Sequence, residues 1–189
     1  MSLVELIAQA DERGLATSGL GCLDRCVPLL GVGGPGDPEE DVLRPLWASL
    51  AEDGADWGAR LVAARGALSG AEGEGEAAEL VRRMLGAAPE RAVTEAWREW
   101  ADACSVAALQ VHRMLDVAQD RATSVSARRE GRTDGMSPLV AAELRRQTQI
   151  LELLAGGGAG GLRQALVVST EGRRVLRAAV SRRARGTER

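Results

Sequence analysis

A single seam of apolar and small residues constrains the fold of this chain more than any other feature of its sequence. Its members are spaced alternately four and three residues apart, and they are Val93, Trp97, Trp100, Cys104, Ala107, Val111, Met114 and Ala118. Such spacing places successive side chains on one side of an α-helix, as in helical bundles and coiled coils. We therefore expect one long helix over about 90–128, spanning roughly 55 Å at about 1.5 Å per residue.

Further apolar residues lie off this seam, and they predict where the long helix lies. Val106, Ala108, Leu109 and Leu115 occupy other faces of the same helix. A helix that is apolar nearly all round is buried among its neighbours. The long helix is thus predicted to be the centre of the fold.

The rest of the chain carries the start and stop signals of shorter helices. Ser2 with Glu5 forms a capping box, and Ser137 before Pro138 is an N-cap followed by a first-turn proline. The ranges predicted as helix are 3–13, 38–52, 56–68, 76–85, 138–155 and 170–184, with apolar segments at 20–30 and 162–168; the last of these could alternatively be a strand. The fold class is therefore all-α, a bundle of about seven to eight helices around the long one.

Glycine-rich stretches and charge divide the chain into three regions of what we expect to be one globular domain. They are an acidic half over 1–88, the long helix and its partner helix over 89–155, and a glycine hinge with an Arg-rich helix over 156–189. Residues 1–127 hold 11 Arg against 21 acidic residues, whereas 128–189 hold 13 Arg against 6. The glycines at 31–36 lack the lysine and preceding strand of a phosphate-binding loop, so a plain loop is predicted there.

Composition indicates the source and compartment of the protein. Lys, Asn, Phe and Tyr are absent, and all 24 basic residues are Arg. This bias is typical of GC-rich bacterial genes, such as those of actinobacteria. The first ten residues lack the basic leader of a signal peptide, and no apolar window reaches the roughly 18 residues of a membrane helix. With three cysteines in no spaced framework, we expect a cytoplasmic protein that does not contact a membrane.

The basic C-terminal stretch is the first candidate surface. Its members are Arg173, Arg174, Arg177, Arg182, Arg183 and Arg185. Arginine clusters of this kind bind phosphates or acidic partners, although the same face could instead dock on the acidic half of the chain. A helix-turn-helix drawn over 140–155 and 162–179 would need a joint at 156–161, which is longer than the three or four residues that the motif uses.

Three cysteines and one histidine raise the question of a metal site. Cys104 and His112 are eight residues apart on one helix, so they lie roughly 12 Å apart and cannot share an ion. A partial set of Cys22, Cys26 and His112 stays open, although buried cysteine is usually a small apolar residue. We predict no cofactor and no metal.

Two other groups are candidates for chemistry or binding. His112 and Asp116 lie one turn apart and could form a general-base pair, but a structural contact is the commoner role. The four tryptophans, Trp47, Trp57, Trp97 and Trp100, together with His112, are candidates for a ligand pocket or a partner hot spot. Packing of the acidic half against the long helix is the simpler explanation of the tryptophans.

These observations favour a non-enzymatic regulatory or protein-interaction protein, with another protein or a second copy as the partner. The homodimer would form through the seam of the long helix. An alternative is a nucleic-acid-associated regulator that uses the Arg-rich helix. A third is a small-ligand binder or enzyme with a pocket between helices, because such sites need no sequence motif.

Overall fold

A computed structural model of the chain describes residues 1–32, 42–91, 93–118, 120, 124–156 and 159–187. Over these residues the chain is all-helical, with nine α-helices and one 3-10 turn and no strand. The elements are α1 Leu3–Gln9, α2 Glu12–Cys26, η1 Val27–Leu30, α3 Arg44–Ala51, α4 Trp57–Leu68, α5 Gly75–Gly86, α6 Thr94–Leu115, α7 Val125–Arg129, α8 Pro138–Ala155 and α9 Ala159–Thr187. The predicted fold class is confirmed, and 162–168 is helix.

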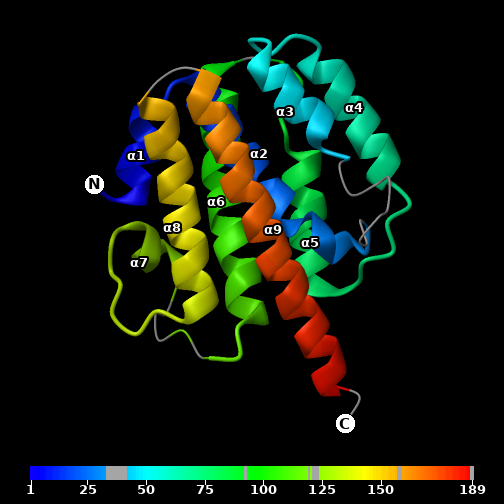
Figure 1. Ribbon diagram of the computed structural model, residues 1–189, viewed down its shortest axis with the longest axis vertical. Helices are drawn as coiled ribbons and strands as arrows, with labels where there is room; N and C mark the ends of the chain where they lie inside the picture. Colours follow the sequence, from blue (N-terminus) through cyan, green and yellow to red (C-terminus); the bar gives the residue numbers. More distant parts are fainter. Residues whose placement is uncertain (33–41, 92, 119, 121–123, 157–158, 188–189) are drawn as a thin grey trace.

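Helices α2, α6, α8 and α9 form the centre of the bundle (Figure 1). α8 and α9 lie side by side and run in opposite directions, while α3 and α4 form a hairpin at one side. The main apolar core takes residues from every α-helix except α7, and a smaller cluster gathers around Leu109, Val125 and Val140. None of the helices in the described ranges is long and apolar enough to cross a membrane.

The predicted helix over about 90–128 is too long, because α6 ends at Leu115. Asp116 adopts an extended backbone, and its carboxylate accepts hydrogen bonds from the backbone N–H groups of Ala118, at 3.2 Å, and Leu139, at 2.7 Å. The second bond ties the end of α6 to the first turn of α8. A contact distant in sequence therefore ends a helix that the local pattern would continue.

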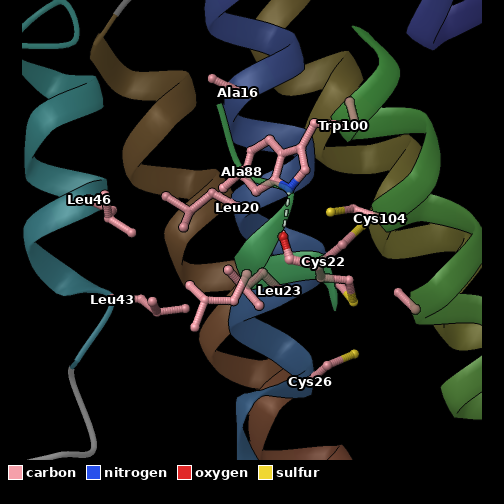
Figure 2. Packing of buried hydrophobic residues seen from close by; sticks show 14 of the residues in the cluster. Ala16, Leu20, Cys22, Leu23, Cys26, Leu43, Leu46, Ala88, Trp100 and Cys104 are labelled. Atoms are coloured by element: carbon pink, nitrogen blue, oxygen red, sulfur yellow. Dashed lines mark hydrogen bonds between the residues drawn. The ribbon is translucent and has the colours of Figure 1, made fainter. Parts of the chain in front are cut away.

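The most deeply buried helix is α2, which begins within the helix predicted over 3–13 and takes in most of the apolar segment at 20–30. Asp11 caps α2 by accepting from the Gly14 N–H at 2.7 Å, and the helix then runs unbroken through Gly19 and Gly21. A Cβ at Gly19 would lie only 2.5 Å from Cε3 of Trp100. Because Gly19 has no side chain, the indole ring of Trp100 can pack directly against α2, and the helix continues through this glycine. Figure 2 shows Trp100 lying beside α2 above Leu20 and Leu23.

The two predicted C-terminal segments are one helix, α9. Buried residues repeat along it at spacings of three and four, at Leu162, Ala165, Ser169, Gly172, Leu176 and Ala179, and Gly161 and Arg173 beside them are buried too. Small residues on this seam let α9 approach α2 closely, since a Cβ at Gly172 would lie 2.3 Å from Cδ of Arg25. α8 and α9 are antiparallel neighbours, so they do not form a helix-turn-helix.

The last turns of α9 extend beyond the other helices (Figure 1). Residues 181–185 are all exposed. Most of the glycine loop predicted at 31–36 falls outside the described residues. The helix predicted over 38–52 is described from Arg44 to Ala51.

Candidate functional site

A buried ion pair between α2 and α8 is the most unusual feature of the core. Arg25 donates from Nε to Glu143 Oε2 at 2.8 Å and from Nη2 to Oε1 at 2.6 Å. Neither side chain has any exposed surface. Burial alone would raise the pKa of Glu143, but the Arg25 charge, with His112 and the hydrogen bonds from Arg25 and Gln147, holds it below its usual range. The pair is therefore ionised, and it joins two core helices.

His112 lies against the same carboxylate from α6. Its Nδ1 is 2.7 Å from the Ala108 carbonyl oxygen, which can only accept, so Nδ1 carries the proton. Nε2 then faces Glu143 Oε2 at 3.5 Å. Burial, opposed by Glu143 and aided by Arg25 and Arg146, lowers the pKa of His112. The ring is therefore neutral at pH 7.

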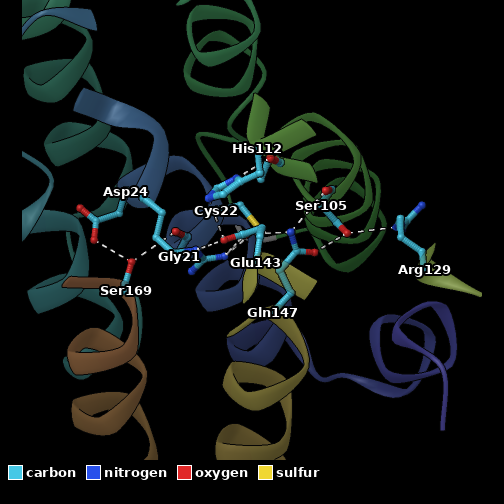
Figure 3. A network of polar contacts seen from close by, with 11 residues as sticks. Gly21, Cys22, Asp24, Ser105, His112, Arg129, Glu143, Gln147 and Ser169 are labelled. Carbon is cyan, nitrogen blue, oxygen red and sulfur yellow. Dashed lines mark hydrogen bonds and ion pairs between the residues drawn. The ribbon is translucent and has the colours of Figure 1, made fainter. Parts of the chain in front are cut away.

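From Glu143 the polar contacts continue toward the surface (Figure 3). Gln147 donates to Glu143 Oε1 at 2.9 Å, and Ser105 donates to Gln147 Oε1 at 2.6 Å. Arg129 of α7 donates to the Ser105 hydroxyl at 3.0 Å and pairs with the half-exposed Asp102. We call this set, from Arg25 to Asp102, the buried polar network. It joins α2, α6, α7 and α8 by directional bonds, which fixes their register.

Three nitrogen atoms around this network have no hydrogen-bond partner among the described residues. They are Nη1 of Arg25, Nη1 of Arg146 and Nε2 of His112. Ser105, His112 and Glu143 have no exposed surface, so a dissolved substrate does not reach them. The arrangement can hold the helices that it joins in one relative position.

A second polar contact fixes α9 on α2 and involves the predicted arginine surface. Asp24 is buried and accepts from the Ser169 hydroxyl at 2.7 Å and from Arg173 Nη1 at 3.3 Å. Ser169 also contacts the Gly21 carbonyl at 3.2 Å. Arg173 is only 8% exposed, so it lies inside the fold and not on a binding surface.

Of the other five arginines of the predicted surface, Arg183 lies on the side of α9 opposite to Arg174. Arg177 is half-buried, and Arg174, Arg182, Arg183 and Arg185 are exposed. Arg183 donates to the Met114 carbonyl near the end of α6, and Arg182 lies about 100° around the helix from it. Arg182 and Arg183 are consecutive residues near the end of α9.

The tryptophans separate into a cluster of three and one that lies apart. Trp57 contacts Trp97 and Trp100 edge to face, with ring centroids 5.0 and 6.3 Å apart, and Trp97 and Trp100 are 5.6 Å apart. Trp57 donates to the Pro89 carbonyl and Trp100 to the Met84 carbonyl. This cluster packs α4 against α6. Trp47 and His112 do not belong to it.

The structure does not bring Cys22, Cys26 and His112 into a metal site. Within the described ranges, no three His, Cys, Asp or Glu side chains are arranged to hold an ion. All three cysteines are buried and free. Burial raises the pKa of Cys22 to about 12 and raises the pKa of Cys26 and Cys104 well above the usual range. Protonated thiols are poor metal ligands.

The proposed His112–Asp116 pair does not form. The carboxylate of Asp116 binds backbone N–H groups, as described for the end of α6, while His112 faces Glu143. The helix ends between the two residues and turns Asp116 toward α8. The seam of α6 also packs within the chain, since Trp97, Trp100, Cys104 and Val111 are buried. The homodimer suggested through this seam stays a prediction.

A groove of about 610 Å³ lies where the end of α6, the start of α8 and the last turns of α9 meet. Its lining is mostly apolar, from Leu115, Val117, Ala118, Pro138, Leu139 and Ala179. Val117 is fully exposed. Arg182 and Arg183 line its α9 side, and Asp116 is the single acidic residue among its described lining. We call this the terminal groove.

Sequence reasoning missed Arg25, Glu143, Gln147 and Arg129. The sequence does carry a signal for Glu143 and Gln147. The buried positions of α8 are Val140, Glu143, Gln147, Ile150 and Leu151. Glu143 and Gln147 thus occupy core positions of an amphipathic pattern. A polar residue at such a position requires a buried partner. Arg25, between Cys22 and Cys26 in an apolar stretch, carries the same signal.

Comparisons with known proteins find no match: no protein-family model, no curated protein and no solved structure corresponds to this chain.

Proposed function

We propose that this chain is a protein-interaction module that binds an acidic, amphipathic helix of a partner protein in the terminal groove. The observation that carries the proposal is the pairing of an apolar floor with two arginines at its α9 side. An amphipathic helix places apolar residues in such a groove and carboxylates beside the guanidinium groups.

The exposure of Val117 supports this assignment. A fully exposed valine gains about 25 cal/mol for each Å² that a partner covers. The charges of Arg182 and Arg183, which line the groove, attract a negatively charged partner to it. A regulatory or adaptor role in the cytoplasm agrees with three free cysteines.

Fluorescence anisotropy of a labelled peptide tests the proposal. The peptide has about 15 residues, with Leu at positions i, i+3, i+4 and i+7 and Glu at most others, and its counterpart replaces every Glu by Lys. We expect the Glu peptide to bind saturably, and Val117→Asp or Arg182→Glu to weaken it at least about tenfold. Arg174→Glu, on the same helix but outside the groove, is the matched control.

Two results would contradict the proposal. One is equal binding of the Glu and Lys peptides. The other is tight binding of a short DNA duplex that Arg174→Glu and Arg182→Glu weaken alike, because that would assign the arginines to a nucleic acid. Concentration-dependent mass in light scattering, lost in Val117→Asp, would instead identify a second copy of the chain as the occupant.

A further inference from the structure

A second groove lies between α3 and the first turns of α9, and it differs in chemistry from the terminal groove. Its volume is about 490 Å³. Its apolar lining comes from Ala48, Ala51, Leu162 and Leu166, and its polar lining from Arg44, Arg163 and Trp47. Among the described residues that line it, the charged ones are both arginines. A ligand here would meet apolar walls and positive charge.

Trp47 is the residue that marks this groove as a binding site. Its side chain is 4% exposed, yet the indole Nε1–H has no acceptor among the described residues. Trp57 and Trp100, buried to a similar degree, both donate to a backbone carbonyl. A buried N–H without an acceptor costs roughly 1–3 kcal/mol, which an incoming acceptor recovers.

Trp47 lines the groove and also reaches the core. A Cβ at Gly21 would lie 3.9 Å from Cη2, at the far edge of the Trp47 ring. Arg163 is exposed and lies one residue beyond Leu162, in the first turns of α9.

We propose that this groove binds a small apolar carboxylate. The carboxylate accepts hydrogen bonds from the Trp47 indole and the Arg163 guanidinium, and the apolar body lies against Leu162 and Leu166. The N-terminal end of α9, where backbone N–H groups point outward, adds favourable potential for an anion. A cavity beside Trp97 makes a contrast, because Glu12 and Asp53 line it together with Arg13 and it favours no single ligand charge.

Nuclear magnetic resonance of the indole N–H groups tests this proposal with octanoate as the probe. We expect octanoate to shift the Trp47 signal downfield and saturably, with that signal assigned by its loss in Trp47→Phe. The Trp57 and Trp100 signals, whose N–H groups already have acceptors, should stay in place. Arg163→Gln should weaken octanoate at least about tenfold, since a charge-assisted hydrogen bond is lost. Arg145→Gln, an exposed change on α8, should not.

Octanol and inorganic phosphate separate the two halves of the ligand. Octanol, which has the chain without the charge, and phosphate, which has charge without the chain, should each bind at least about tenfold more weakly than octanoate. An unmoved Trp47 signal, or octanol as effective as octanoate, would overturn the proposal. So would undiminished binding in Arg163→Gln, which keeps the test decisive even if Trp47→Phe does not fold. Val117→Asp leaves this groove intact, so the outcome is independent of the terminal groove.

Discussion

Arg25 and Glu143 face each other across the α2–α8 contact as a two-bonded ion pair that solvent does not reach. Around this pair, α6 contributes His112 and Ser105, and α7 contributes Arg129. Burying ions costs free energy that their attraction offsets only with good geometry and further hydrogen bonds. The network therefore specifies how the helices pack more than it stabilises them.

Removing one partner of the Arg25–Glu143 pair should lower the free energy of unfolding far more than replacing both partners by apolar residues. We expect Glu143→Gln to lower the free energy of unfolding by about 3–5 kcal/mol, because it leaves the Arg25 charge buried and unpaired. The double variant Arg25→Met with Glu143→Leu should regain most of that loss. Urea unfolding measures both. Glu95→Gln, which removes the exposed partner of Arg98, is the control and should change stability by less than about 1 kcal/mol. Equal losses for Glu143→Gln and Glu95→Gln would refute a buried ionised pair.

His112 should make stability depend on pH in a defined window. Its pKa in the folded state is lowered from 6.5, so below about pH 6.5 the unfolded chain binds more protons than the folded one. Stability should therefore fall as the pH drops from 7 toward 5, by at most about 1.4 kcal/mol per pH unit. Because Glu143 has its pKa lowered from 4.5, its contribution is lost only at more acidic pH.

Urea unfolding at several pH values tests this dependence. His112 is the single histidine of the chain, so His112→Gln should flatten the profile between pH 5 and 7. An unchanged slope in that variant would show that His112 is not the titrating group.

Gly19 and Trp100 should be coupled in stability. In Gly19→Ala the new methyl group would lie 2.5 and 2.6 Å from two atoms of the rigid Trp100 ring, which should cost about 1–3 kcal/mol. Adding Trp100→Leu should make the combined loss smaller than the sum of the two single losses. Gly66→Ala, also within a helix but with open space around its Cβ, should instead stabilise by about 0.5–1 kcal/mol. Additive losses at 19 and 100 would contradict the close contact.

The three cysteines should be unreactive until the chain unfolds. Cys22, Cys26 and Cys104 are completely buried, and burial keeps their thiols protonated at neutral pH. A thiol reagent such as dithionitrobenzoate should therefore label none of them in buffer and all of them in concentrated urea. Rapid labelling of native protein would show that the α2–α6 contact opens.

The parts of the fold that followed from the sequence are those that local chemistry decides. The capping box at Ser2 and Glu5 is present as predicted, and α8 begins at Pro138 as predicted, but the Ser137 hydroxyl makes no capping hydrogen bond to a described residue. Other boundaries were wrong. The helix predicted over 3–13 ends at Gln9, and the Asp11 cap begins a second helix that runs through Gly14. The end of α6 depends on an Asp116 bond to Leu139.

The candidate sites were less predictable than the fold. Arg173 belongs to an arginine run in sequence, but the seam of α9 turns it toward Asp24. Only the three-dimensional path of the chain brings Val117 and Leu139 beside Arg182. Trp47 and Trp57 look alike in sequence, and they differ because only one has a backbone carbonyl within reach of its N–H.

Site-directed photo-crosslinking tests the terminal groove most directly. The native thiols are buried, so a benzophenone maleimide can be placed on Val117→Cys alone, with the exposed Val62→Cys of α4 as its matched control. We expect the Glu–Leu peptide to crosslink at position 117 and not at 62, and the Lys–Leu peptide to crosslink at neither. Equal yields at 117 and 62, or no adduct at 117, would contradict the assignment of this groove as the partner-binding site.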